Sequence, residues 1–130
     1  MTVLMAAFMA VVIVLATSVA GLGALYAARA SAQIAAEAAA LAAAVSTYPP
    51  ASSTGPVQAA RDAAAENAAG LVACRCQRDY SLSVRLVEVV TVVTATVPVL
   101  GEWEVRAVAR AEFDPIRWLG GLGVPISSGR

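Results

Sequence analysis

The chain has 130 residues, of which 59% are apolar and only 14% charged, and its formal net charge is zero. A soluble domain is nearer half apolar and a quarter charged, so this composition argues against an ordinary soluble domain. The zero net charge argues against a nucleic-acid partner. Without His or Lys, the chain lacks the commonest general base, zinc ligand and Schiff-base nucleophile. We therefore expect no enzyme, and no metal, cofactor or small-molecule substrate.

Residues 1–28 carry no charge and are almost entirely apolar. A run of about 20 apolar residues spans a bilayer as a helix, and this run is longer and contains no Pro. Tyr26 and Arg29 end it, as an aromatic and a cation that suit the membrane interface. We expect a single-pass anchor with the C-terminal domain outside the cell membrane. A cleaved signal peptide is the alternative, although the usual signal core has only 7–15 apolar residues.

The helix is expected to continue through an Ala-rich extension at 29–47 and to end before Pro49 and Pro50. Its larger apolar residues fall on one face, at spacings of seven and four. They are Ile34, Leu41 and Val45.

Small residues on this long helix would let other backbones approach closely. Gly23 and Ala27 form a small-xxx-small pair, and Ala35 and Ala39 continue the small surface. We expect these four residues to pack against partner helices, and a homo-oligomer is one arrangement. Phe at Ala35 or Ala39 should then block association and leave the external domain folded. The alternative is that the Ala content only reflects a GC-rich genome.

Residues 48–55 are a linker rich in Pro, Ser and Gly, and an external module follows at 56–113. A short helix should start at Pro56, with Thr54 or Ser53 as its cap, and stop at Gly70. From Leu71 the apolar pattern alternates, which predicts strands, with a turn at 98–102. The expected strands are 71–76, 80–88, 90–98 and 102–113.

The fold class expected from these elements is α+β. A long transmembrane, pilin-like helix precedes a short helix that packs on a small antiparallel sheet of three or four strands. Arg and Glu should line the outer face of the sheet and pair across strands. The Gly-rich residues 114–130 are expected to be a flexible tail.

Cys74 and Cys76 form a Cys-x-Cys pair. On a strand these two side chains point to the same face, so their sulfur atoms are neighbours. They are a candidate disulfide, which would suit a location outside the membrane. Two half-buried thiols are the alternative. The spacing does not match a thioredoxin-type motif or a zinc site.

Two segments carry a family resemblance. The apolar helix leads into Ala-Arg-Ala-x-Ala-Gln at 28–33 and then into the Ala/Leu run around Glu37. The second segment begins with GLVACRC at 70–76 and ends with VRAVARAEF at 105–113. In this order they resemble TadE/TadG-like proteins of Flp (tight adherence) pilus loci, closest to the short TadE-like proteins of high-GC Gram-positive bacteria.

The resemblance implies a single-pass membrane protein that assists assembly of a type IV-like pilus or associated secretion. Its implied partners are other pilus-assembly or pilin-like proteins, bound through the N-terminal helix. Met5 stands where type IV pilins carry Glu, and no Glu precedes Glu37. Either processing information lies upstream, or the protein stays unprocessed in the membrane. A pilin-like filament subunit and a secreted protein with a cleaved signal remain alternatives.

Overall fold

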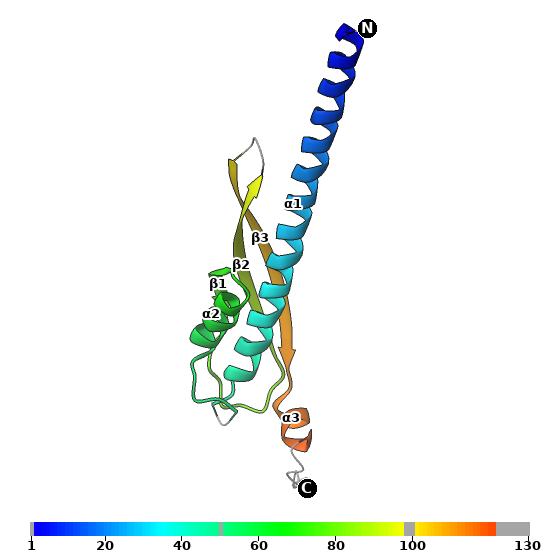
Figure 1. The fold of residues 1–130 in the computed structure, drawn as a ribbon. Helices are drawn as coiled ribbons and strands as arrows, with labels where there is room; N and C mark the ends of the chain where they lie inside the picture. The colour runs from blue at the N-terminus through cyan, green and yellow to red at the C-terminus, as the bar shows by residue number, and fades with distance from the viewer. Residues whose placement is uncertain (1, 50, 98–100, 122–130) are drawn as a thin grey trace, which may run out of the picture.

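The computed structural model describes residues 2–49, 51–97 and 101–121 (Figure 1). It has the expected α+β class, with a long apolar helix, a short helix and a three-stranded antiparallel sheet. The sheet was expected to pack on the short helix, but it lies mainly against the long one. The elements in chain order are α1 (Thr2–Ser46), α2 (Pro56–Glu66), β1 (Gly70–Arg75), β2 (Arg85–Val97), β3 (Gly101–Phe113) and α3 (Pro115–Gly121).

Helix α1 is a single helix of 45 residues, as predicted from its Ala-rich, Pro-free sequence. It ends where the Thr47 hydroxyl donates to the carbonyl of Ala44, two residues before Pro49. Its first half projects beyond the rest of the molecule, and its second half lies against the sheet and α2 (Figure 1). The N-terminus and α3 are therefore at opposite ends of the molecule (Figure 1).

The sheet has the strand order β1-β2-β3. Strands β2 and β3 pair along their whole length, from Arg85 with Phe113 to Val97 with Gly101. Gly101 has a φ of 83°, which glycine adopts without steric cost, and this agrees with its predicted place in a turn. Of the predicted turn at 98–102, residues 98–100 lie outside the described residues.

One face of the sheet contacts α1, and the other carries charged pairs. Val87, Val89 and Thr91 of β2 are buried. On the outer face, the Glu88 carboxylate lies 2.7 Å from Arg110 and 3.8 Å from Arg75. The expected cross-strand pairing of Arg and Glu is confirmed, although such exposed pairs each contribute only a few tenths of a kcal/mol.

The core is built mainly from alanine. The buried side chains of α1 face those of α2 and the inner face of the sheet. Alanine side chains let two helices approach closely, so α2 lies directly beside α1 (Figure 1). The buried alanines of these two helices are Ala28, Ala32, Ala35, Ala36, Ala39, Ala40, Ala43, Ala44, Ala60 and Ala64.

The prediction of separate strands at 80–88 and 90–98 is wrong, because a single strand covers 85–97. The alternation of Leu82 and Val84 with Ser81 and Ser83 imitates a strand. Those residues instead form an irregular loop in which the Ser81 and Ser83 hydroxyls lie 2.6 Å apart. Short polar side chains bond locally and compete with sheet formation.

The predicted ends of α2 are also wrong. Gly55, rather than Thr54 or Ser53, occupies the N-cap position, and Pro56 is the first helical residue. The helix stops at Glu66, before the predicted stop at Gly70, which instead begins β1. The Asn67 amide group donates to the carbonyl of Ala63, which caps the end locally.

The prediction of a flexible tail is wrong for residues 115–121, which form α3. The Asp114 carboxylate accepts the backbone N–H groups of Ile116 and Arg117 at 2.9 and 3.2 Å, which caps the helix. Trp118 packs against Tyr48 and Phe113, with ring centroids 6.3 and 6.5 Å apart. These aromatic contacts offset the helix-weakening effect of the glycines. Residues 122–130 lie outside the described residues.

Candidate functional site

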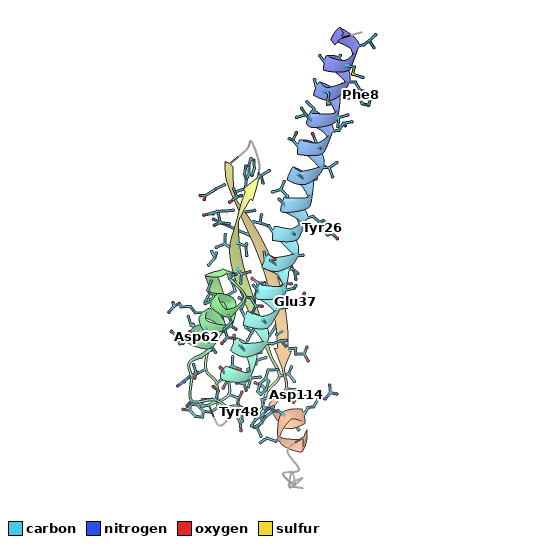
Figure 2. All side chains as sticks on the ribbon, viewed as in Figure 1. Phe8, Tyr26, Glu37, Tyr48, Asp62 and Asp114 are labelled. Atoms are coloured by element: carbon cyan, nitrogen blue, oxygen red, sulfur yellow. A yellow bond between two sulfur atoms is a disulfide. The ribbon has the colours of Figure 1, made fainter. Side chains whose placement is uncertain are left out.

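The first half of α1 is the largest unburied apolar surface among the described residues. We call residues 4–20, whose side chains are all exposed, the bare half. By length and composition this helix could cross a membrane, and a signal sequence would pass the same test. Figure 2 shows its side chains projecting on all sides, with Phe8 labelled. The apolar N-terminal helix is thus consistent with a membrane anchor or a signal.

The hydroxyl groups of the bare half are satisfied within the helix. Thr17 donates to the carbonyls of Ile13 and Val14 at 3.0 Å, and Ser18 donates to the carbonyl of Val14 at 2.7 Å. A polar group without a partner is costly in hydrocarbon, and these internal bonds remove that cost. The bare half is therefore compatible with a lipid environment in its backbone and in these side chains.

The sheet first meets α1 at Gly21. A Cβ atom at Gly21 would lie 3.4 Å from the Val97 side chain, at the end of β2. Further along, the buried Thr91 hydroxyl donates to the carbonyl of Ala32 at 2.9 Å. Strand β2 thus runs alongside α1 in the opposite direction, and its end at Val97 marks where the bare half stops (Figure 1).

Tyr26 and Arg29, the expected interface anchors, lie just beyond this junction. Both are exposed, Tyr26 at 80% of its surface. Together with Ala30 and Gln33 they line a shallow groove on α1. The predicted boundary at residue 28 therefore falls within the part of α1 that the sheet already flanks, because Ala28 is buried.

The four expected helix-packing residues divide into two pairs. Gly23 and Ala27 are exposed, and nothing lies within 4 Å of a Cβ placed at Gly23. Ala35 and Ala39 are completely buried within this chain. Phe at Ala35 or Ala39 was expected to leave the external domain folded, but with both residues buried we now expect it to destabilise the module by overfilling its core.

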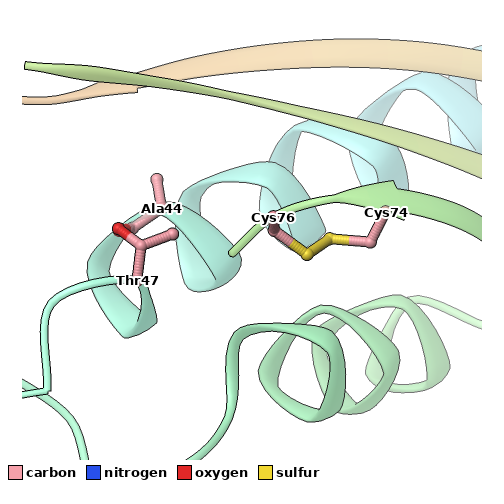
Figure 3. Close-up of a disulfide and its surroundings, with 4 residues drawn as sticks. All are labelled: Ala44, Thr47, Cys74 and Cys76. Atoms are coloured by element: carbon pink, nitrogen blue, oxygen red, sulfur yellow. A yellow bond between two sulfur atoms is a disulfide. The ribbon is translucent and has the colours of Figure 1, made fainter. Parts of the chain in front are cut away.

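A disulfide joins Cys74 and Cys76 across the end of β1, with their Cα atoms 5.4 Å apart (Figure 3). Cys76 is buried in the core, and Cys74 is partly buried against it. Figure 3 shows the bond near Ala44 and Thr47, at the end of α1. The closed loop is so short that its entropic stabilisation is only about 1–2 kcal/mol.

Sequence reasoning missed Arg85, which organises the loop before β2. Its guanidinium donates to the carbonyls of Asp79 at 2.6 Å, Thr47 at 3.4 Å and Ser81. It also lies 5.9 Å from the centre of the Tyr48 ring, a cation–π contact. Arg85 thereby ties the loop to the end of α1. No local pattern distinguishes it, because its partners are backbone carbonyls of the loop itself and of Thr47, which is distant in sequence.

Asp79 supports the same loop. Its carboxylate accepts the backbone N–H of Ser81 at 2.8 Å and the Ser81 hydroxyl at 2.7 Å. These two hydrogen bonds, with a smaller contribution from the nearby Arg85 charge, hold the pKa of Asp79 below its usual range. In addition, the Asp79 backbone N–H donates to the Thr47 carbonyl at 2.9 Å.

Comparisons of the chain with protein-family models, curated proteins and solved structures found no match.

Proposed function

We propose that the protein is a membrane-anchored, TadE-like accessory component of Flp or type IV-like pilus assembly or an associated secretion system. The proposed membrane anchorage rests on one observation: α1 is a single helix of 45 residues whose two halves have different surroundings. Its first half is bare and apolar, and its second half forms one wall of the module core. Because no flexible joint separates the two halves, the anchor would hold the module at a fixed distance from the membrane.

The module would lie outside the cell membrane. The Cys74–Cys76 disulfide supports this side, because disulfides persist in oxidising compartments and are rare in the cytosol. The pilus role rests on the resemblance of the two sequence segments to TadE/TadG-like proteins.

A pilin-like filament subunit is the second candidate, and the unburied face of α1 favours it. Gly23, Ala27, Ile34 and Leu41 all lie exposed on α1. In a subunit that left the membrane, this face and the bare half would pack against other helices inside a fibre.

Location and processing can be tested with single cysteines in a Cys74→Ala, Cys76→Ala background. Thr94→Cys lies on the exposed outer face of β2, and Thr17→Cys lies within the bare half. In intact, wall-permeable cells, a membrane-impermeant maleimide should label Thr94→Cys and leave Thr17→Cys unlabelled. Mass spectrometry of the same samples should show the full-length chain in the membrane fraction.

Three results would contradict the anchored arrangement. Labelling of Thr94→Cys only after lysis would reverse the orientation. A chain shortened by its apolar segment and found in the medium would favour the secreted alternative. Recovery of the full helix in sheared fibres would favour the filament subunit.

The pilus role needs a separate measurement. Deleting the gene should abolish surface fibres, and the wild-type gene supplied in trans should restore them. Unchanged fibres counted by electron microscopy would contradict the pilus role while leaving the membrane anchor intact.

A further inference from the structure

The ends of β2 and β3 nearest to Gly21 of α1 carry an exposed aromatic side chain. Trp103 lies on β3, two residues after the strand begins, and pairs with Ala95 of β2. It is 52% exposed, an unusual position for the largest apolar side chain. Its exposure raises the question of which environment surrounds this end of the sheet.

Two contacts between β2 and α1 determine the position of Trp103 along the axis of α1. Val97 lies against Gly21, and Thr91 is hydrogen-bonded to the carbonyl of Ala32. Ala95 is one third of the way from Val97 to Thr91, so it lies level with the residue one third of the way from Gly21 to Ala32. That position is at residue 24 or 25, one or two residues before Tyr26. Trp103, as the partner of Ala95, therefore lies at about the height of the exposed Tyr26.

The rise of the helix per residue relates this position along α1 to the thickness of a bilayer. The helix from Thr2 to residue 20 is about 28 Å long at 1.5 Å per residue, close to the roughly 30 Å hydrocarbon thickness. By the same rise, the level of Trp103 lies about 7 Å beyond residue 20 and Tyr26 lies about 9 Å beyond it. The headgroup zone on each side is about 5–8 Å deep, so Trp103 falls in its outer part and Tyr26 at its outer edge.

We propose that the ends of β2 and β3 around Trp103 form a second membrane contact. Trp103 and Tyr26, which projects from the side of α1 away from the sheet (Figure 2), would lie at a similar depth among the lipid headgroups. Tyr and Trp are the residues that membrane interfaces favour. The inference rests on the proposed membrane anchorage. A helix fixed at one point can tilt freely, whereas a helix and a hairpin that both contact the bilayer hold the module upright.

The charges around this contact favour a zwitterionic surface. Glu104 and Arg106 form an ion pair at 3.4 Å on the outer face, and Glu102 and Arg29 are exposed nearby. Acidic and basic groups are balanced, so attraction to anionic lipid is not required. All four groups would remain in the hydrated headgroup zone, where charges are tolerated.

Tryptophan fluorescence tests the contact, because the described chain carries one Trp at each end of the module. Trp118→Phe leaves only Trp103, and Trp103→Phe leaves only Trp118, which packs on Tyr48 and Phe113 at the far end. Each full-length variant is reconstituted in phosphatidylcholine vesicles brominated at shallow or deep acyl positions. We expect shallow bromine to reduce Trp103 emission at least twofold, with a smaller effect of deep bromine and almost none on Trp118.

Different results would contradict the membrane anchorage and the second membrane contact. A chain that does not float with the vesicles would contradict the anchorage itself. A chain that floats while its Trp103 is unquenched, or is quenched no more than Trp118, would overturn the hairpin contact. Stronger quenching by deep than by shallow bromine would also overturn it, by placing Trp103 in hydrocarbon.

A second probe covers the case in which a Trp variant does not fold. An environment-sensitive fluorophore on Thr96→Cys, near the hairpin end, should shift to the blue on reconstitution. The same fluorophore on Glu112→Cys, at the other end of the same sheet face, should not shift. Equal shifts at the two sites would contradict the proposal. Both variants use the Cys74→Ala, Cys76→Ala background.

Discussion

At the scale of single residues, polar contacts at one end of the module hold a long loop in place. Arg85 and Asp79 both connect the loop to the carbonyl of Thr47, directly after α1. Each uses charged or backbone groups whose partners are distant in sequence. The hydrogen bonds of the Arg85 guanidinium are charge-assisted and so stronger than neutral ones, whereas the bond of the Asp79 backbone N–H is neutral. Together they hold the loop without regular secondary structure.

The lowered pKa of Asp79 predicts a pH-dependent contribution to stability. A group whose pKa falls on folding stabilises the folded state when it is ionised. That contribution is fully present above the ordinary value of 3.8 and is lost as the pH falls through the lower folded-state pKa. The difference in unfolding free energy between wild type and Asp79→Asn should therefore be constant from neutral pH to about 5 and shrink below about 4.

Urea unfolding in detergent micelles at each pH measures this difference. The matched control repeats the comparison in a Ser81→Ala background, which removes the hydroxyl donor to Asp79. There the difference between Asp and Asn should be smaller at neutral pH. A difference that grows as the pH falls would contradict the assigned cause.

At the scale of elements, α1 places its small residues inward and its large residues outward. Ile34, Leu41 and Val45 share one face, as their spacing predicted, and that face is exposed. The alanine face is buried because α2 and the sheet lie close to the helix backbone. The core therefore depends on close approach more than on large apolar side chains.

A pair of substitutions on α1 tests this packing. Ala39→Leu inserts a larger side chain at a completely buried position and should lower the free energy of unfolding by about 1–3 kcal/mol. Ala30→Leu, at an exposed position of the same helix, should change it by less than about 0.5 kcal/mol. Urea unfolding in detergent micelles measures both. Equal effects would contradict the close-packed alanine interface.

At the scale of the whole molecule, the two halves of α1 contribute differently to folding. Residues 4–20 are exposed, whereas the helix from Ala32 onward supplies one side of the core. The bare half exposes apolar surface and supplies none of the buried core residues of the module. The second half supplies many of those core residues, so the module needs it in order to fold. Anchor and module thus share one element.

Two truncations test this division. A chain that begins at Gly21 should keep the near-ultraviolet circular dichroism of the module and unfold cooperatively. A chain that begins at Tyr48 should be unfolded, since it lacks the buried alanines of α1. Both are measured by circular dichroism and urea titration. A folded module without α1 would show that the alanine interface is dispensable.

The sequence alone determined the elements whose signals are local. The run of apolar and Ala residues without Pro specified α1, and the strict alternation before Phe113 specified β3, because helix and strand periodicities reside in neighbouring side chains. Adjacency on one strand face made Cys74 and Cys76 a candidate disulfide and left two free thiols as the alternative. The sequence did not show the loop at 76–84 or α3, since the loop depends on bonds to Thr47 and α3 depends on the ring contact of Trp118 with Tyr48, both distant in sequence.

Only the tertiary structure decided which small residues of α1 are used within the chain. Gly23, Ala27, Ala35 and Ala39 look equivalent in the sequence, yet the first two are exposed and the last two are buried. The difference arises because β2 and α2 cover only part of the helix, on one side. Periodicity identifies the faces of a helix, but the three-dimensional path of the chain determines what each face meets.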